Sequence, residues 1–71
     1  MTLRQFINVF NFDGSQKVEI FTFSAITGKE NYIDTYFSEQ QIENDLFIVL
    51  YDVVEIRPIG EFTLQIVITE I

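Results

Sequence analysis

The first ten residues have the spacing of an amphipathic helix. Their apolar side chains recur three and four positions apart, so one helical face is formed by Leu3, Phe6, Ile7 and Phe10. Thr2 can cap this helix, and Gln5 stands three residues later, which is the spacing of a capping box. The pattern predicts a helix over residues 2–10 that ends in the turn-forming stretch 11–14.

Residues 16–24 are rich in β-branched and aromatic side chains, which is typical of a strand. The alternation of the apolar side chains changes phase along this segment. Val18 and Ile20 share one face of the strand, whereas Phe21 and Phe23 share the other. The change predicts either a bulge near Ile20 or a strand whose two faces are both covered.

Turn residues follow this strand and bring the chain back. Residues 27–30, with Gly28 among them, predict a turn. Residues 31–37 then predict a partner strand, so the two strands form a hairpin.

The next segment is ambiguous between helix and strand. Ser38 and Gln41 repeat the capping-box spacing, and helical spacing continues through Ile42, Leu46, Val49, Leu50 and Val53. Residues 47–54 are also dense in strand formers. The interpretation favoured here is a helix over 39–50 followed by a strand over 52–57.

Residues 61–70 give the clearest strand pattern in the chain. Apolar and mostly polar positions alternate, with Phe62, Leu64, Ile66 and Ile68 on one face and Thr63, Gln65, Val67 and Thr69 on the other. Such a pattern is typical of an antiparallel sheet with one wet side. Pro58 cannot donate to a ladder, so it ends the preceding strand or lies on an edge, and Gly60 completes the turn.

The order of elements is therefore α-β-β-α-β-β. We predict a single α+β domain over residues 1–71, a two-layer sandwich. Its antiparallel sheet of about four strands would carry one or two short helices on one face.

Composition argues against catalysis. The chain has no His and no Cys, so the commonest general base and every thiolate ligand are missing, and its serines have no His to activate them. The carboxylates lack the spacing of a calcium loop. We predict a protein that is not an enzyme, with no cofactor and no metal site; a small enzyme or metal binder is the least favoured alternative.

The net charge of −7 is unevenly distributed along the chain. Residues 30–56 hold seven carboxylates and no Lys or Arg. Nucleic-acid affinity depends on basic side chains that neutralise phosphates, so direct binding to nucleic acid is not expected, nor is binding to an anionic membrane. The acidity has two interpretations. It keeps a small apolar domain in solution, or it binds a basic protein surface through Glu30, Asp34, Tyr36, Glu39, Glu43 and Asp45.

No stretch resembles a signal peptide or a membrane span. The longest apolar stretch, residues 46–51, is far shorter than the roughly 20 residues needed to cross a bilayer. A soluble cytoplasmic protein is expected.

Two segments support a resemblance to other proteins. The opening segment 2–10 followed by the strand Lys17-Val18-Glu19-Ile20, and the later strand Val53-Val54-Glu55-Ile56, resemble short uncharacterised acidic proteins encoded by phages and other mobile elements of low-GC Gram-positive bacteria. Residues 27–46 do not match that pattern. The resemblance implies a mobile-element origin, where small acidic proteins are often inhibitors of host defence nucleases.

Two functions follow as hypotheses. The first is a non-enzymatic, anti-CRISPR-like inhibitor that uses a nucleic-acid-mimicking acidic surface to block a nuclease or another nucleic-acid-binding protein. The alternative is a structural or assembly protein that self-associates, as a homodimer for example, through a sheet edge. The uncharged segment 62–69 suggests that edge.

Overall fold

The computed structural model describes residues 1–10, 16–45 and 48–69. Its elements, in chain order, are α1 (Leu3–Val9), β1 (Lys17–Phe23), β2 (Glu30–Tyr36), α2 (Glu39–Glu43), β3 (Asp52–Ile59) and β4 (Thr63–Thr69). This order and the α+β class confirm the prediction. The expected helix end at residues 11–14 and positions 46, 47 and 70 of the expected elements lie outside the described residues.

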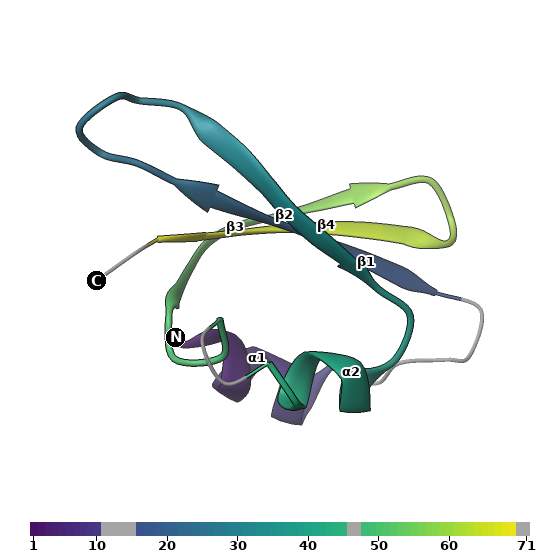
Figure 1. The fold of residues 1–71 in the computed structure, drawn as a ribbon. Helices are drawn as coiled ribbons and strands as arrows, with labels where there is room; N and C mark the ends of the chain where they lie inside the picture. Colours follow the sequence, from purple (N-terminus) through teal and green to yellow (C-terminus); the bar gives the residue numbers. More distant parts are fainter. Residues whose placement is uncertain (11–15, 46–47, 70–71) are drawn as a thin grey trace.

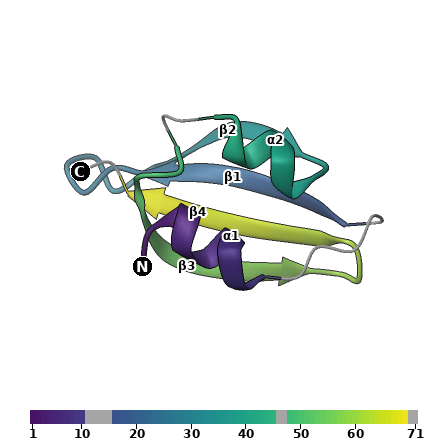
Figure 2. The ribbon, with the colours of Figure 1, turned by 90° about the horizontal axis from the view of Figure 1, so that it is seen from below.

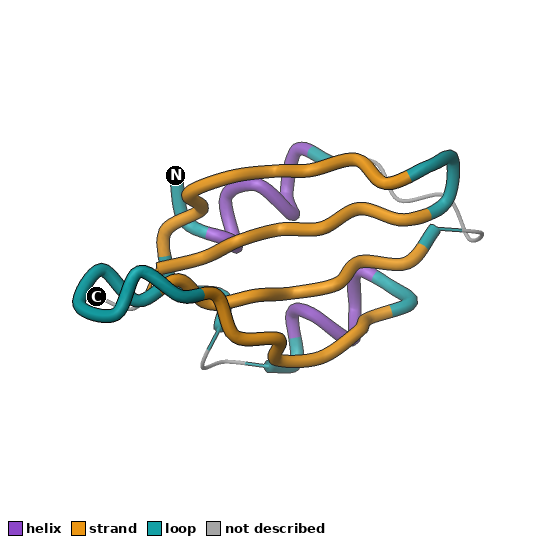
Figure 3. The backbone as a smooth tube through the Cα atoms, turned by 90° about the horizontal axis from the view of Figure 1, so that it is seen from above, coloured by secondary structure: helices purple, strands orange, loops and turns teal. Residues whose placement is uncertain are grey.

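The elements form two layers, with both helices beneath one face of a four-stranded sheet (Figure 1). Seen from the helix side, α2 lies over β1 and β2, while α1 lies over β4 and β3 (Figure 2). The opposite face of the sheet, called the outer face below, carries no further element of the described chain (Figure 3).

The strand order is β2-β1-β4-β3, and the sheet is mixed. Each hairpin is antiparallel, but the two hairpins meet through β1 and β4, which run parallel. The prediction of a purely antiparallel sheet is corrected here. The segment from β2 to β3 crosses beneath the sheet through α2 and reaches the far edge, so β4 returns beside β1 in the same direction. Alternation along β4 cannot reveal the direction of its neighbours.

The capping box of α1 forms as predicted. Thr2 Oγ1 accepts from the Gln5 backbone N–H at 3.2 Å, and Gln5 Oε1 accepts from the Thr2 N–H at 2.9 Å. Leu3 and Ile7 on the helix are fully buried, in agreement with the predicted apolar face.

The predicted bulge near Ile20 is present. Ile20 lies opposite Asp34, whereas the next residue, Phe21, lies opposite Tyr32. Ile33 is therefore the extra residue on β2, and its side chain is exposed. Because the extra residue belongs to β2, β1 itself alternates regularly, with Val18, Ile20 and Thr22 buried. The apolar positions of β1 change phase because Phe21 on the other face is covered as well, by Tyr32 and Arg57.

Helix α2 is much shorter than the predicted helix over 39–50. Ser38 caps it by accepting from the Gln41 N–H at 3.2 Å, but the helix ends at Glu43. The carbonyls of Val49 and Tyr51 accept from the first backbone N–H groups of α1 at 2.9 and 2.8 Å. Those carbonyls satisfy donors that α1 leaves free, so tertiary contact overrides the helical spacing of residues 48–50.

The core lies between the sheet and the helices. Its fully buried side chains include two from α1, one from α2 and four from the central strands, namely Leu3, Ile7, Ile42, Val18, Ile20, Ile66 and Ile68. Pro58 lies within β3, which is an edge strand, as one of the two predictions for it required. Gly60 has a φ of +69° in the following turn, a conformation that suits glycine.

Candidate functional site

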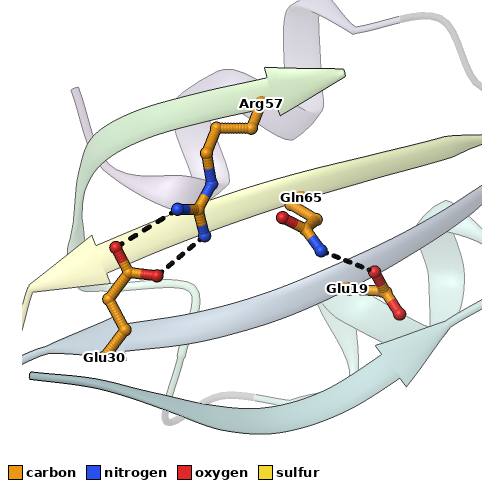
Figure 4. Close-up of polar contacts among 4 residues, drawn as sticks. All are labelled: Glu19, Glu30, Arg57 and Gln65. Atoms are coloured by element: carbon orange, nitrogen blue, oxygen red, sulfur yellow. Dashed lines mark hydrogen bonds and ion pairs between the residues drawn. The ribbon is translucent and has the colours of Figure 1, made fainter. Parts of the chain in front are cut away.

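The acidic residues from β2 and α2 divide between the two faces of the sheet. Glu30 opens β2 and pairs with Phe23, so it shares the outer face with the residues of β1 that point away from the helices. There its carboxylate makes a bidentate contact with Arg57 of β3, at 2.8 Å to Nη2 and 3.3 Å to Nη1 (Figure 4). Glu30 is therefore already neutralised within the chain.

This ion pair links the two opposite edge strands of the sheet. The strong twist between the hairpins brings β2 and β3 close enough for it (Figure 1). The Arg57 guanidinium also lies 5.6 Å from the centre of the Phe21 ring, which makes an edge contact with Tyr32. Charge and aromatic contact thus hold Arg57 back over the outer face.

Tyr36 was predicted as an interface residue, but its side chain belongs to the core. It is 7% exposed, and its hydroxyl donates to Asp45 Oδ2 at 2.7 Å. This bond fastens the end of β2 to the segment that follows α2. Tyr36 can support a binding surface only by positioning Asp45.

Burial, the hydrogen bond to Asp45 and the nearby Asp34 carboxylate raise the pKa of Tyr36 well above its ordinary value of 10.0. The unfolded chain therefore loses this proton first as the pH rises. The stabilisation by the neutral phenol is complete below pH 10.0 and falls above it.

We expect Tyr36→Phe to lower the free energy of unfolding by about 1–2 kcal/mol at pH 8, because a hydrogen bond to a carboxylate is lost. Above pH 10.0 the wild type loses up to about 1.4 kcal/mol per pH unit through this group. The gap between the two proteins should therefore narrow by pH 11, as measured by urea unfolding. A gap that is unchanged between pH 8 and 11 would contradict this role, since Tyr32 and Tyr51 are present in both proteins.

The other four predicted carboxylates lie on the β2–α2 side of the molecule. We call Asp34, Glu39, Glu43 and Asp45 the acidic flank. Asp34 and Glu43 are exposed, and Glu39 and Asp45 are half-buried. Helix α2 packs against β2, and residues 30–45 contain no Lys or Arg, so no cation from these two elements interrupts the flank.

One cation approaches the flank from another element. A hollow of about 380 Å³ between the helices is lined by Arg4, Asn8, Glu43 and Asn44. Arg4 therefore lies near the Glu43 end of the flank. The sequence could not predict this proximity, because the two residues are far apart in the chain. The pairing of Arg57 with Glu30 was missed for the same reason.

The described residues contain no group of three or more Asp, Glu, His or Cys side chains that could hold a metal ion. No helix within the described ranges is long and apolar enough to cross a bilayer. The chemistry available at the flank is that of carboxylates in water, which attract cations and accept hydrogen bonds.

Comparison with known proteins gives no relative. No protein-family model matches the chain, and no curated protein or solved structure matches it. The resemblance to mobile-element proteins therefore stays a prediction, and function has to be argued from the surface of the molecule.

Proposed function

We propose that this chain is a non-enzymatic binding module whose acidic flank binds a cationic surface on a nucleic-acid-binding protein. The observation that carries the proposal is the collection of Asp34, Glu39, Glu43 and Asp45 around β2 and α2, without a cation from either element. Spaced carboxylates present negative charge in a way that a groove lined by Lys and Arg recognises.

The flank is smaller than the surface predicted from the sequence. Glu30 forms an ion pair with Arg57 of the same chain, and Tyr36 is buried with its hydroxyl donating to Asp45. A nuclease of a host defence system is the partner class that the mobile-element resemblance suggests, and the cytoplasm is the compartment in which such a partner works. In this proposal the chain occupies the groove that nucleic acid would otherwise fill.

The test uses the full chain as bait in a bacterial lysate at low and at high salt. A captured partner is purified, and a double-stranded DNA oligonucleotide is titrated into the complex. We expect capture at low salt, release at high salt, and displacement of the chain by DNA. A partner that holds the chain and the DNA together contradicts the proposal.

Two double variants are compared, each of which replaces two glutamates by lysines, on opposite sides of the molecule. Glu39→Lys with Glu43→Lys alters the flank, whereas Glu55→Lys with Glu61→Lys makes the same change in net charge near β3. We expect the first pair to weaken the complex by roughly tenfold or more at low salt, because each lost contact and each new repulsion contributes up to about 1 kcal/mol. Equal weakening by both pairs would leave only the net charge as the cause.

A further inference from the structure

Strand β3 leaves one long side open to solvent. It is an edge of the sheet. Among the described residues, only its beginning is covered, by a bridge between Thr2 and Asp52 and by the Val53 N–H donating to the Met1 carbonyl at 2.7 Å. No other described strand pairs with the edge of β3 that faces away from β4. Backbone groups on such an edge can pair with another strand.

Apolar side chains accompany these free backbone groups. Val54 is 52% exposed, Ile56 is 39% exposed and Ile59 is 49% exposed. Natural edges are commonly protected by charge, and the charges between residues 53 and 59 are Glu55 and Arg57. Because Glu30 and Phe21 hold the Arg57 guanidinium back over the outer face, the protection of this edge by charge is weaker than the sequence suggests, and it rests more on Pro58 and on the bulge at Val54.

The sequence of β3 is complementary to itself when two copies run antiparallel with Ile56 opposite Ile56. Glu55 then lies opposite Arg57 of the second copy, on the same face of the sheet. The flanking pair is apolar, with Val54 opposite Pro58. Pro58 lacks an N–H, so that pair is limited to the bond its carbonyl accepts. Val54 is also the extra residue of a β-bulge in β3, because Val53 pairs with Ile68 and Glu55 pairs with the next residue of β4, Val67. Moving the centre to Glu55 or to Arg57 places like charges opposite each other, which disfavours those registers.

We propose that this chain forms a homodimer through its β3 edges, paired antiparallel and centred on Ile56. The pairing joins two four-stranded sheets into one continuous sheet. The acidic flank lies at the other edge, on β2 and α2, so both flanks stay accessible and the proposal is independent of the one above.

The test exploits the absence of cysteine from the chain. Ile56→Cys places a single thiol at the centre of the proposed pairing, where the Cα separation of about 4.5–5.5 Å suits a disulfide. Ile26→Cys is the control, because Ile26 is 97% exposed in the turn between β1 and β2, away from this edge. Under a mild oxidant we expect Ile56→Cys to form covalent dimer about ten times faster or more, since pairing raises the effective concentration of the two thiols.

Sedimentation of the chain without cysteine provides an independent measurement. We expect its average mass to rise from that of one chain towards that of two as concentration increases, and Ile56→Lys to remain a monomer. Ile26→Lys should behave like the wild type. A wild type that stays monomeric at every concentration overturns the proposal, as does equal cross-linking of the two cysteine variants. Unchanged capture by the acidic flank in Ile56→Lys would show that the two proposals stand or fall separately.

Discussion

Ile66→Ala is expected to remove about half of the stability of this domain. Ile66 is fully buried on β4, between β1 and β3, and it contacts the core shared with both helices. Truncating a buried isoleucine costs about 2–5 kcal/mol, because transfer energy is lost and a cavity remains. A domain of this length has a total free energy of unfolding of about 4–10 kcal/mol. Urea unfolding followed by circular dichroism measures the loss as a lower midpoint.

Ile26→Ala is the matched control for this experiment. It deletes the same atoms from a side chain that is 97% exposed, so its effect should lie within about 0.5 kcal/mol. Similar midpoints for the two variants would mean that Ile66 does not lie in a packed core.

The parts of the fold that sequence predicted best are those fixed by neighbours along the chain. The capping box of Thr2 and Gln5 spans three residues, and the turn at Gly28 depends on a backbone φ of +69°. Both features arise from local chemistry, so their residue types reveal them. The predicted strands over 16–24 and 61–70 are confirmed as β1 and β4 for the same reason, apart from shifts of one or two residues at their ends within the described residues.

The parts that sequence predicted poorly depend on residues far apart. The expected helix over 39–50 had correct spacing, but the Val49 carbonyl within it accepts from the Arg4 N–H of α1 instead. The parallel pairing of β1 and β4 follows from the path of the chain beneath the sheet. The spacing of apolar residues along the sequence does not reveal that path. Segment 62–69 was suggested as a self-associating edge, and that suggestion is wrong because β4 is an inner strand.

The candidate site shows the same division. Sequence found the acidic stretch itself, since a run without Lys or Arg is visible in one dimension. It could not show that Glu30 faces Arg57 across the sheet, or that Tyr36 is turned into the core. Long-range pairing therefore reduced six predicted residues to a flank of four, and it also drew Arg57 away from the edge of β3.

Val67 is a position where the sequence pattern predicts an exposed side chain and the structure shows a buried one. Along β4 it alternates with Ile66 and Ile68, so the pattern placed it on the wet face with Thr63 and Gln65. It does face away from the helices, yet it is only 1% exposed. Its neighbours across the two adjacent strands are Phe21 and Glu55, and Phe21 is itself covered by Arg57. The twist of the sheet therefore buries part of the outer face without any helix.

Val67→Asp is accordingly expected to destabilise the domain severely. A carboxylate at a site with 1% exposure loses its hydration, at an effective cost of several kcal/mol, unless it binds a proton. The pKa of this new carboxyl would be raised in the folded state. Its destabilising effect should therefore be smallest below the unfolded pKa of about 4, where only the neutral carboxyl is buried, and should grow as the pH rises to 7.

Thr63→Asp is the control, because it adds the same charge to the same face of β4 at a half-buried position. Thermal unfolding of both variants at pH 4 and pH 7 separates the local effect from the general repulsion in an acidic chain, which the two variants share. If the outer face were wet, as alternation alone suggests, the two variants would unfold at similar temperatures at both pH values. Burial by the twisted hairpins requires Val67→Asp to be the less stable variant at pH 7, with the difference shrinking at pH 4.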